Sequence, residues 1–195
     1  MKLNSLDISS FISTGNFHTV AGLTFDKLEG RLIFPVVDLL GGVIGFSGRT
    51  ITPLLQQAKY FNSPTSLVYK KSLSLYGLYQ AYQRIQEYDF AVLVEGNIDV
   101  CMCHQTGIEN AIAPCGTALR QEHLLLLEHF TPNIVCVFDN DAAGKVATTK
   151  ARTLCRDNDC NFYSVTLSEA KDPDEFIRKF GGEEFKNLIN EALKG

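Results

Sequence analysis

The stretch Cys136–Lys145 reads CVFDNDAAGK, and it decides the fold because an apolar run stops at two aspartates, Asp139 and Asp141. Residues 133–138 (NIVCVF) have the composition of a buried strand, and the Ala-rich residues 142–157 that of a helix. Two acids at such a junction either cap the helix or bind a cation. The neighbouring segments help to distinguish these two roles.

The second half of the chain alternates between short apolar runs and helical segments. Apolar runs without strict alternation are typical of strands that are covered on both faces. Strands that alternate with helices predict βαβ units and a mostly parallel sheet. The expected strands are 89–94, 110–114, 133–138 and 161–167, and the expected helices are 97–106, 118–130, 142–157, 173–180 and 183–193.

Polar residues follow each expected strand. The carboxyl ends of parallel strands meet at one end of the sheet, where open α/β sheets place their sites. Mg²⁺ prefers oxygen ligands and often takes one or two carboxylates plus substrate phosphates, and two ions can assist phosphoryl transfer. The sequence therefore predicts a divalent-cation site at this end. This end would carry Glu95, Gly116, Thr117, Asp139, Asp141 and the loop 168–174 with Lys171, Asp172 and Asp174, and the acids among them are the candidate ligands.

Helix capping is the alternative role for these acids. Asp141 precedes three small residues, and the segment 172–175 (DPDE) has Asp at N-cap, Pro at N1 and Glu at N3. Capping accounts for Asp141 and Asp172, but not for Glu95, Asp139 and Asp174 at the same end of the sheet. Their joint convergence favours the cation site.

The first half lacks this alternation. Residues 31–38 and 43–49 flank Gly41-Gly42, which is a hairpin signal. Residues 59–64 read as a loop or short strand, and residues 72–87 as a helix with an internal Gly77. We therefore expect an N-terminal mixed α+β subdomain at 1–88, followed by an α/β domain at 89–195.

Composition limits the class of protein. The 195 residues carry a net charge of −4, divided into +2 over residues 1–90 and −6 over residues 91–195. This balance argues against a protein held on nucleic acid by bulk charge, but permits a basic surface facing an acidic site. There is no long apolar run and no signal-peptide pattern, so we expect a cytoplasmic protein with no membrane partner.

Cysteine and histidine give no sign of a zinc site. The six cysteines form no C-x-x-C pair, so we expect free thiols in a reducing compartment. We expect Leu124–Leu127 to be core residues of a helix, with His123 and His129 partly exposed.

Two acidic signatures of the second half resemble those of a TOPRIM domain. They are the segment 95–100 (EGNIDV) and the segment 139–144 (DNDAAG). TOPRIM domains occur in bacterial primases, topoisomerases and some nucleases. Asn140 stands where the family often has Gly, and we expect it to tolerate a left-handed turn conformation.

The first half resembles the basic subdomain of the RNA polymerase core of bacterial DnaG-type DNA primases. The matching motifs, in the same order, are FPVVD, GGVIGFSGRT, KYFNSP and YGLY. The segments 114–118 (PCGTA) and 171–174 (KDPD) also fit the primase version of TOPRIM. The resemblance runs from about residue 25 to the C-terminus.

The resemblance implies DNA-templated synthesis of short RNA primers by nucleotidyl transfer with Mg²⁺ or Mn²⁺. The implied partners are a single-stranded DNA template, nucleoside triphosphates and the RNA primer. Glu95, Asp139 and Asp141 would be the main metal and catalytic residues, extended by Asp172 and Asp174. Residues expected near nucleotide or template are Arg49, Lys59, Asn62, Lys70 and Lys71, and supporting residues are Gly96, Asp99, Gly116, Thr117 and Gly144.

Two other functions stay open at this point. One is a TOPRIM-type nuclease that uses the same metals, and the other is a nucleic-acid-binding module without catalysis. DnaG-type primases normally also have a zinc-binding domain and a helicase-interacting domain, and neither is in this sequence. We therefore expect the chain to be an excised core or a piece of a larger protein. That protein would bind a replicative helicase through a domain absent here.

Overall fold

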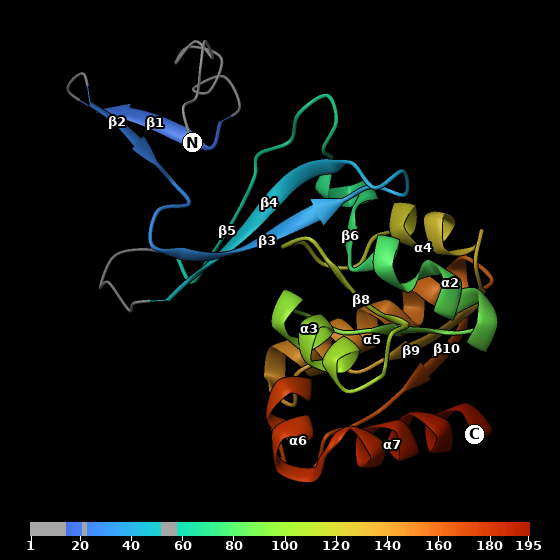
Figure 1. Ribbon diagram of the computed structural model, residues 1–195. Helices are drawn as coiled ribbons and strands as arrows, with labels where there is room; N and C mark the ends of the chain where they lie inside the picture. Colours follow the sequence, from blue (N-terminus) through green and yellow to red (C-terminus); the bar gives the residue numbers. More distant parts are fainter. Residues whose placement is uncertain (1–14, 21–22, 52–57) are drawn as a thin grey trace. The chain divides into compact units, whose positions relative to one another are not determined.

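The computed structural model describes residues 15–20, 23–51 and 58–195, and is shown in Figure 1. It contains two compact units. The first comprises the chain up to Val36 together with Val43–Lys70, and the second comprises Val37–Gly42 and Lys71–Gly195. The first 14 residues of the expected subdomain 1–88 lie outside the described residues.

A five-stranded sheet forms the centre of the second unit. Its strand order is β10-β9-β7-β8-β6, and all neighbours are parallel except β6, which runs antiparallel to β8. This confirms the expected mostly parallel sheet. The strands are β6 Leu75–Tyr76, β7 Ala91–Leu93, β8 Ala111–Pro114, β9 Asn133–Cys136 and β10 Asn161–Ser164.

Helices cover both faces of this sheet (Figure 1). Val92 and Val135 pack in one buried cluster with residues of α3, α6 and α7. Leu93 and Ile134 point the other way and pack with residues of α2, α4 and α5. The helices are α2 Leu78–Tyr88, α3 Asn97–Gln105, α4 Gln121–Leu127, α5 Ala142–Asp157, α6 Pro173–Phe180 and α7 Gly182–Lys194, with the 3-10 turn η1 at Lys71–Leu73.

The prediction of a single helix over residues 72–87 is wrong. Gly77 has a left-handed backbone with φ +84°, so it ends strand β6 and begins helix α2 instead of lying inside a helix. A side chain at Gly77 would come 2.8 Å from Val100. The segment therefore contributes an edge strand and a helix to the second unit.

The expected exposure of His123 is also wrong. His123 is fully buried, while His129 is exposed. Of the four leucines expected in the core, Leu124 and Leu127 are buried, but Leu125 is exposed and Leu126 is half-buried. The Nδ1 atom of His123 accepts from the backbone N of Arg120 at 3.2 Å, and its Nε2 lies 3.0 Å from the carbonyl oxygen of Lys71. The ring thus fastens α4 to the 3-10 turn.

The first unit contains two small sheets. Strands β1 Phe17–Val20 and β2 Leu23–Asp26 pair antiparallel, and β3 Arg31–Val37, β4 Val43–Thr50 and β5 Tyr60–Asn62 form a three-stranded sheet. The expected hairpin is confirmed. Its turn is closed by a 2.9 Å bond from Asp38 N to Gly42 O, and Gly41 has φ +85°.

The six cysteines are free, and Cys101 is exposed whereas Cys103 is buried. Within the described ranges, none of the helices has the length and apolar character needed to cross a membrane.

Candidate active site

Glu95 and Asp139 come together at the carboxyl end of the parallel strands. Glu95 follows β7 and Asp139 follows the neighbouring strand β9. An Oε1 atom of Glu95 accepts a hydrogen bond from the backbone N of Asp139 at 3.1 Å. The two acidic segments are therefore joined by a direct contact between the Glu95 carboxylate and the Asp139 backbone.

Gly144 allows the first turn of α5 to pack against the backbone of Asp139. A Cβ atom at this position would lie 1.9 Å from the carbonyl oxygen of Asp139, which no packing adjustment of a side chain can relieve. Gly144 is buried, and its N donates to Asp141 Oδ1 at 2.8 Å. This glycine fixes where the strand ends and where the helix begins.

Asp141 and Asp172 both cap helices, as the alternative role supposed. Asp141 is the N-cap of α5, and Asp172 is the N-cap of α6, where Oδ1 accepts from Glu175 N at 2.8 Å. In each cap one carboxylate oxygen accepts the backbone hydrogen bond. The same side chain can therefore cap a helix and bind a cation. Asp172 also lies 3.7 Å from the Lys171 ammonium.

Asp99 lies behind the strand ends and joins two of the loops. One oxygen accepts from Gly96 N at 3.1 Å and the other from Asp174 N at 3.3 Å. Burial, followed by the negative charges of Asp172 and Asp139, raises the pKa of Asp99 to about 7, against the effect of the two backbone donors. Several carboxyl groups are therefore close enough to repel one another.

Asn140 has a structural role other than the one predicted for it, which was a left-handed turn. It has no left-handed backbone; the positive-φ residues other than glycine in the described part are Asp89 and Asp159. Its Nδ2 instead donates to Leu167 O at 2.6 Å, and its N donates to Lys171 O at 2.7 Å. Asn140 thus ties the DxD segment to the loop 168–174. The amide between two acids was the only signal in the sequence.

The loop after β8 borders a pocket beside the carboxylates. Gly116 has φ +66°, and Thr117 lies with Glu95 and Phe138 on the wall of a pocket of about 430 Å³ that reaches Lys150. The hydroxyl oxygen of Thr117 is buried and makes no hydrogen bond to the described part of the chain. The structure therefore places Thr117 near Glu95, as expected.

The donor set fits a hydrated divalent cation better than a metal held by protein alone. In the part of the chain that the structure describes, no three His, Cys, Asp or Glu side chains gather in a group able to hold a metal ion. The Glu95 carboxylate nonetheless contacts the backbone of Asp139, and the charges of Asp139 and Asp172 act on Asp99 nearby. One or two carboxylates with water and phosphate oxygens are the common ligand set of Mg²⁺.

The predicted phosphate-binding residues lie mainly in the first unit. Arg49 on β4 lies over the ring of Tyr60 at 5.7 Å and donates to its hydroxyl at 3.3 Å. Asn62 is on β5 opposite Ser47, Lys59 and Lys70 are exposed, and Lys71 begins the second unit. Their action together with the carboxylates stays a prediction.

Two family models match the chain. The model described as the N-terminal domain of the DNA primase catalytic core matches residues 1–82, and the model described as Toprim-like matches residues 92–177. The expected division between residues 88 and 89 lies between these matches, whereas the second compact unit begins its main segment at Lys71.

Curated relatives and solved structures agree with these models. The DNA primase of Aquifex aeolicus is 41% identical over 193 residues, which are 98% of this chain and 38% of that protein. The crystal structure of the A. aeolicus primase zinc-binding and RNA polymerase domains has a TM-score of 0.88 at 41% identity, covering 95% of this chain and 46% of that one.

A structure of the DnaG primase catalytic domain bound to ssDNA has a TM-score of 0.84 at 34% identity, covering 94% of this chain and 60% of that one. The chain thus spans well under half the length of the curated relative from A. aeolicus. The two family models together cover most of its sequence, in the same order as in the motifs found from the residues. The chain belongs to the DnaG-type DNA primase catalytic-core family, with a primase core N-terminal domain followed by a Toprim domain.

Proposed function

We propose that the chain is the part of a DNA primase that joins ribonucleotides into short RNA primers on a single-stranded DNA template during replication. The observation that carries the proposal is the direct contact between Glu95 and the backbone of Asp139 at the carboxyl end of the sheet. Two further observations support it: the ordered matches to both primase domains, and the ssDNA-bound structure of a relative.

In this proposal the carboxylates hold divalent cations, with Glu95, Asp139 and Asp141 as the main ligands and Asp172 and Asp174 as an extension. When bound, Mg²⁺ or Mn²⁺ would neutralise charge on the phosphates and lower the pKa of the attacking hydroxyl. Asp99, hydrogen-bonded to Gly96 N and Asp174 N, would hold these segments in register. The DxD segment is positioned by Gly144 and Asn140.

The reaction is an in-line transfer. The primer 3′-hydroxyl oxygen forms a bond to the α-phosphorus of the incoming nucleoside triphosphate, the α–β phosphoanhydride bond breaks, pyrophosphate leaves and the hydroxyl proton passes to solvent. Arg49 can grip a phosphate with its guanidinium fork, and a lysine supplies a point charge. We assign Lys59, Lys70 and Lys71 to nucleotide phosphates, and Arg49 and Asn62 to nucleotide or template.

Further parts of the proposal concern the whole protein. A replicative helicase would bind through a domain outside this chain, and the reaction would take place in the cytoplasm. The free cysteines fit a reducing compartment.

The test is incorporation of labelled ribonucleotides on single-stranded DNA with Mg²⁺ or Mn²⁺. Glu95→Gln keeps an acceptor for the Asp139 N–H, and Asp141→Asn keeps a good N-cap, so each removes charge while preserving the local bond. We expect each variant, and Asp139→Asn, to lose about 100-fold or more of the rate.

The matched control is Asp157→Asn, an exposed acid at the other end of α5. It should retain full activity. If the wild-type chain cleaves DNA and incorporates no ribonucleotide, the primase proposal is wrong and the nuclease reading replaces it. Equal activity of wild type and Glu95→Gln would remove the carboxylates from the mechanism.

A further inference from the structure

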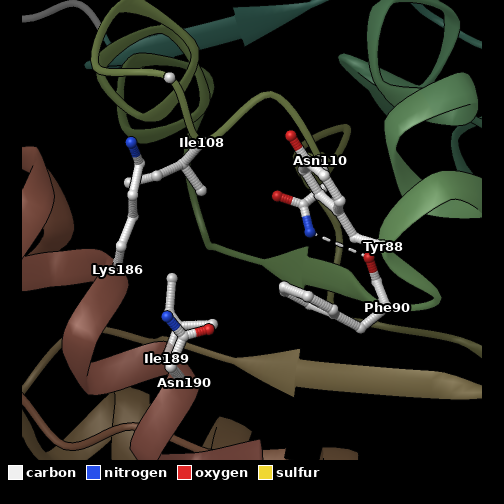
Figure 2. Close-up of a pocket in the computed structure, with 8 residues that line it drawn as sticks. Tyr88, Phe90, Ile108, Asn110, Lys186, Ile189 and Asn190 are labelled. Atoms are coloured by element: carbon white, nitrogen blue, oxygen red, sulfur yellow. Dashed lines mark hydrogen bonds between the residues drawn. The ribbon is translucent and has the colours of Figure 1, made fainter.

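A second pocket lies at the amino end of the same sheet, away from the carboxylates (Figure 2). Its walls come from the residues just before β7 and β8 and from one side of helix α7. The volume is about 340 Å³, within the range of small-molecule sites. The lining residues that carry the argument are Phe90, Gly107, Ile108, Asn110, Lys186 and Ile189.

The body of the pocket is apolar and fixed. Ile108 and Ile189 are 3% and 2% exposed and belong to the buried cluster under α7. The ring of Phe90 stacks on that of Tyr88, with centroids 6.3 Å apart and an interplanar angle of 28°. Two branched aliphatic walls facing a stacked aromatic ring suit a flat, apolar ring of a ligand.

Asn110 supplies a hydrogen-bond acceptor. Its side chain is 2% exposed, and its Nδ2 donates to the carbonyl oxygen of Phe90 at 3.0 Å. Because only the NH₂ group can donate to a carbonyl, this bond decides which way the amide faces. The amide oxygen then points into the pocket, as Figure 2 shows. A ligand ring with an N–H group would satisfy it.

Lys186 supplies a positive charge. Its ammonium lies beside Gly107, where an added Cβ would come 3.3 Å from Nζ. The partner of this ammonium within α7 is Glu183 at 2.7 Å, whose side chain is 86% exposed. An ion pair this exposed contributes little, so the ammonium can exchange it for an anionic group of a ligand at small cost.

We propose that this pocket binds a heteroaromatic anion, a flat ring that carries an N–H donor and an acidic group. The ring occupies the space between Phe90, Ile108 and Ile189. The N–H donates to Asn110, and the acidic group pairs with Lys186. The site is separate from the carboxylates and does not depend on the proposed polymerase activity.

Indole-3-acetate is a probe with all three features. The chain contains no tryptophan, so indole fluorescence excited beyond the absorption of its seven tyrosines reports the ligand. We expect saturable binding by fluorescence anisotropy. Naphthalene-1-acetate, which lacks the N–H, should bind several-fold more weakly, and tryptamine, which has the opposite charge, should bind more weakly still.

Two variants test the assignment of the residues. Lys186→Met keeps the apolar stem and removes the charge, and should weaken binding about tenfold, the loss expected for one charge-assisted hydrogen bond. Asn190→Phe places a ring at the exposed mouth of the pocket and should block it. Lys194→Met and Asn187→Phe, exposed positions of α7 outside the pocket lining, are the matched controls and should bind as wild type does.

The proposal is overturned if indole-3-acetate does not bind the wild-type chain. It is equally overturned if Lys186→Met and Asn190→Phe both bind with wild-type affinity, since the ligand would then lie elsewhere. Circular dichroism of each variant confirms that a loss of binding is not a loss of fold.

Discussion

The loops at the two ends of the central sheet are held together by hydrogen bonds of opposite direction. At the amino end, neutral side chains donate to backbone carbonyls: Thr131 and Asn133 to Asp89 O, and Asn110 to Phe90 O. At the carboxyl end, carboxylates accept from backbone N–H groups: Glu95 from Asp139, and Asp99 from Gly96 and Asp174. Both ends are tied by hydrogen bonds, but at the carboxyl end the carboxylates of Asp99, Asp139 and Asp172 lie close enough to repel one another.

This difference explains how the acids of the carboxyl end can stabilise the fold and still bind a cation. A carboxylate that accepts one backbone bond still has unused lone pairs and a full charge. A neutral amide oxygen could accept the same backbone N–H groups without the charge. The excess charge at the carboxyl end is therefore not needed for folding, and it is the property that a cation would use.

The largest effect on stability is expected from the close approach at the carboxyl end. Gly144→Ala would drive a methyl group into the Asp139 carbonyl and should lower the free energy of unfolding by about 3 kcal/mol. Gly107→Ala at the amino end, with φ +81° and only the flexible tip of Lys186 nearby, should cost about 1 kcal/mol. Urea denaturation of both variants measures the contrast, and equal losses would contradict it.

Cation binding should stabilise the carboxyl end alone. We expect Mg²⁺ or Mn²⁺ to raise the melting temperature, by the equivalent of about 2.7 kcal/mol when the free cation is a hundredfold above its Kd. Glu95→Gln should reduce this shift. Asp89→Asn, at the amino end, should retain it, and a shift of the same size in both variants would place the cation elsewhere.

Two amides give a matched pair with a smaller effect. Asn140→Ala and Asn133→Ala each remove a bond from a side-chain amide to a backbone carbonyl, and each should cost about 1 kcal/mol of stability. Asn133→Ala also removes an exposed bond from Asn161 Nδ2, which should add little. Only Asn140→Ala should also lower the rate of primer synthesis, because it loosens the DxD segment. Loss of rate in the Asn133 variant at unchanged folding would blur the distinction between the two ends.

The smallest expected effect is the pH dependence of stability that arises from His123, which lies outside the group of carboxylates. Burial lowers the pKa of His123, and a proton added to Nδ1 would face the Arg120 N–H that this atom now accepts from. The unfolded chain therefore binds the proton more readily, and stability should fall as the pH drops below the unfolded pKa of about 6.5. Asp99, whose folded pKa is about 7, titrates in the same window with the opposite sign, but it does so equally in all three proteins. Relative to wild type, the denaturation midpoint of His123→Gln should therefore lose less stability between neutral pH and pH 5, whereas His129→Gln should follow the wild type.

Element bounds could be predicted best from the sequence where residues next to the ends of the element determine those ends. Helix α5 has the bounds expected of it, since Asp141 caps it and a polar segment ends it. The expected helix over 118–130 is shorter, Gln121–Leu127, because its ends depend on packing. The junction of Glu95 with Asp139 followed from the rule for parallel strands, whereas the buried position of His123 depends on the distant Lys71 carbonyl and left no local pattern.

The candidate site shows the same division. The two helix caps could be recognised from neighbouring residues, and Gly144 through the resemblance of the segment 139–144 to the TOPRIM signature. The role of Asn140 could not, because its partners Leu167 and Lys171 are 27 and 31 residues away in the sequence. Gly77 was misread because a glycine inside a helical pattern is tolerated, and only the pairing of Leu75–Tyr76 with β8 shows that the chain must turn there.

That two-residue strand has a consequence for solubility. The four residues of β8 are all buried, and without Leu75–Tyr76 one side of this apolar strand would present unpaired backbone groups. Such a border is a template for the strand of another molecule. The short antiparallel segment covers it and leaves an edge strand of only two residues, which offers little to the strand of another molecule. A fragment that begins after Tyr76 would keep every carboxylate of the site, yet would carry an aggregation-prone border that the longer chain has closed.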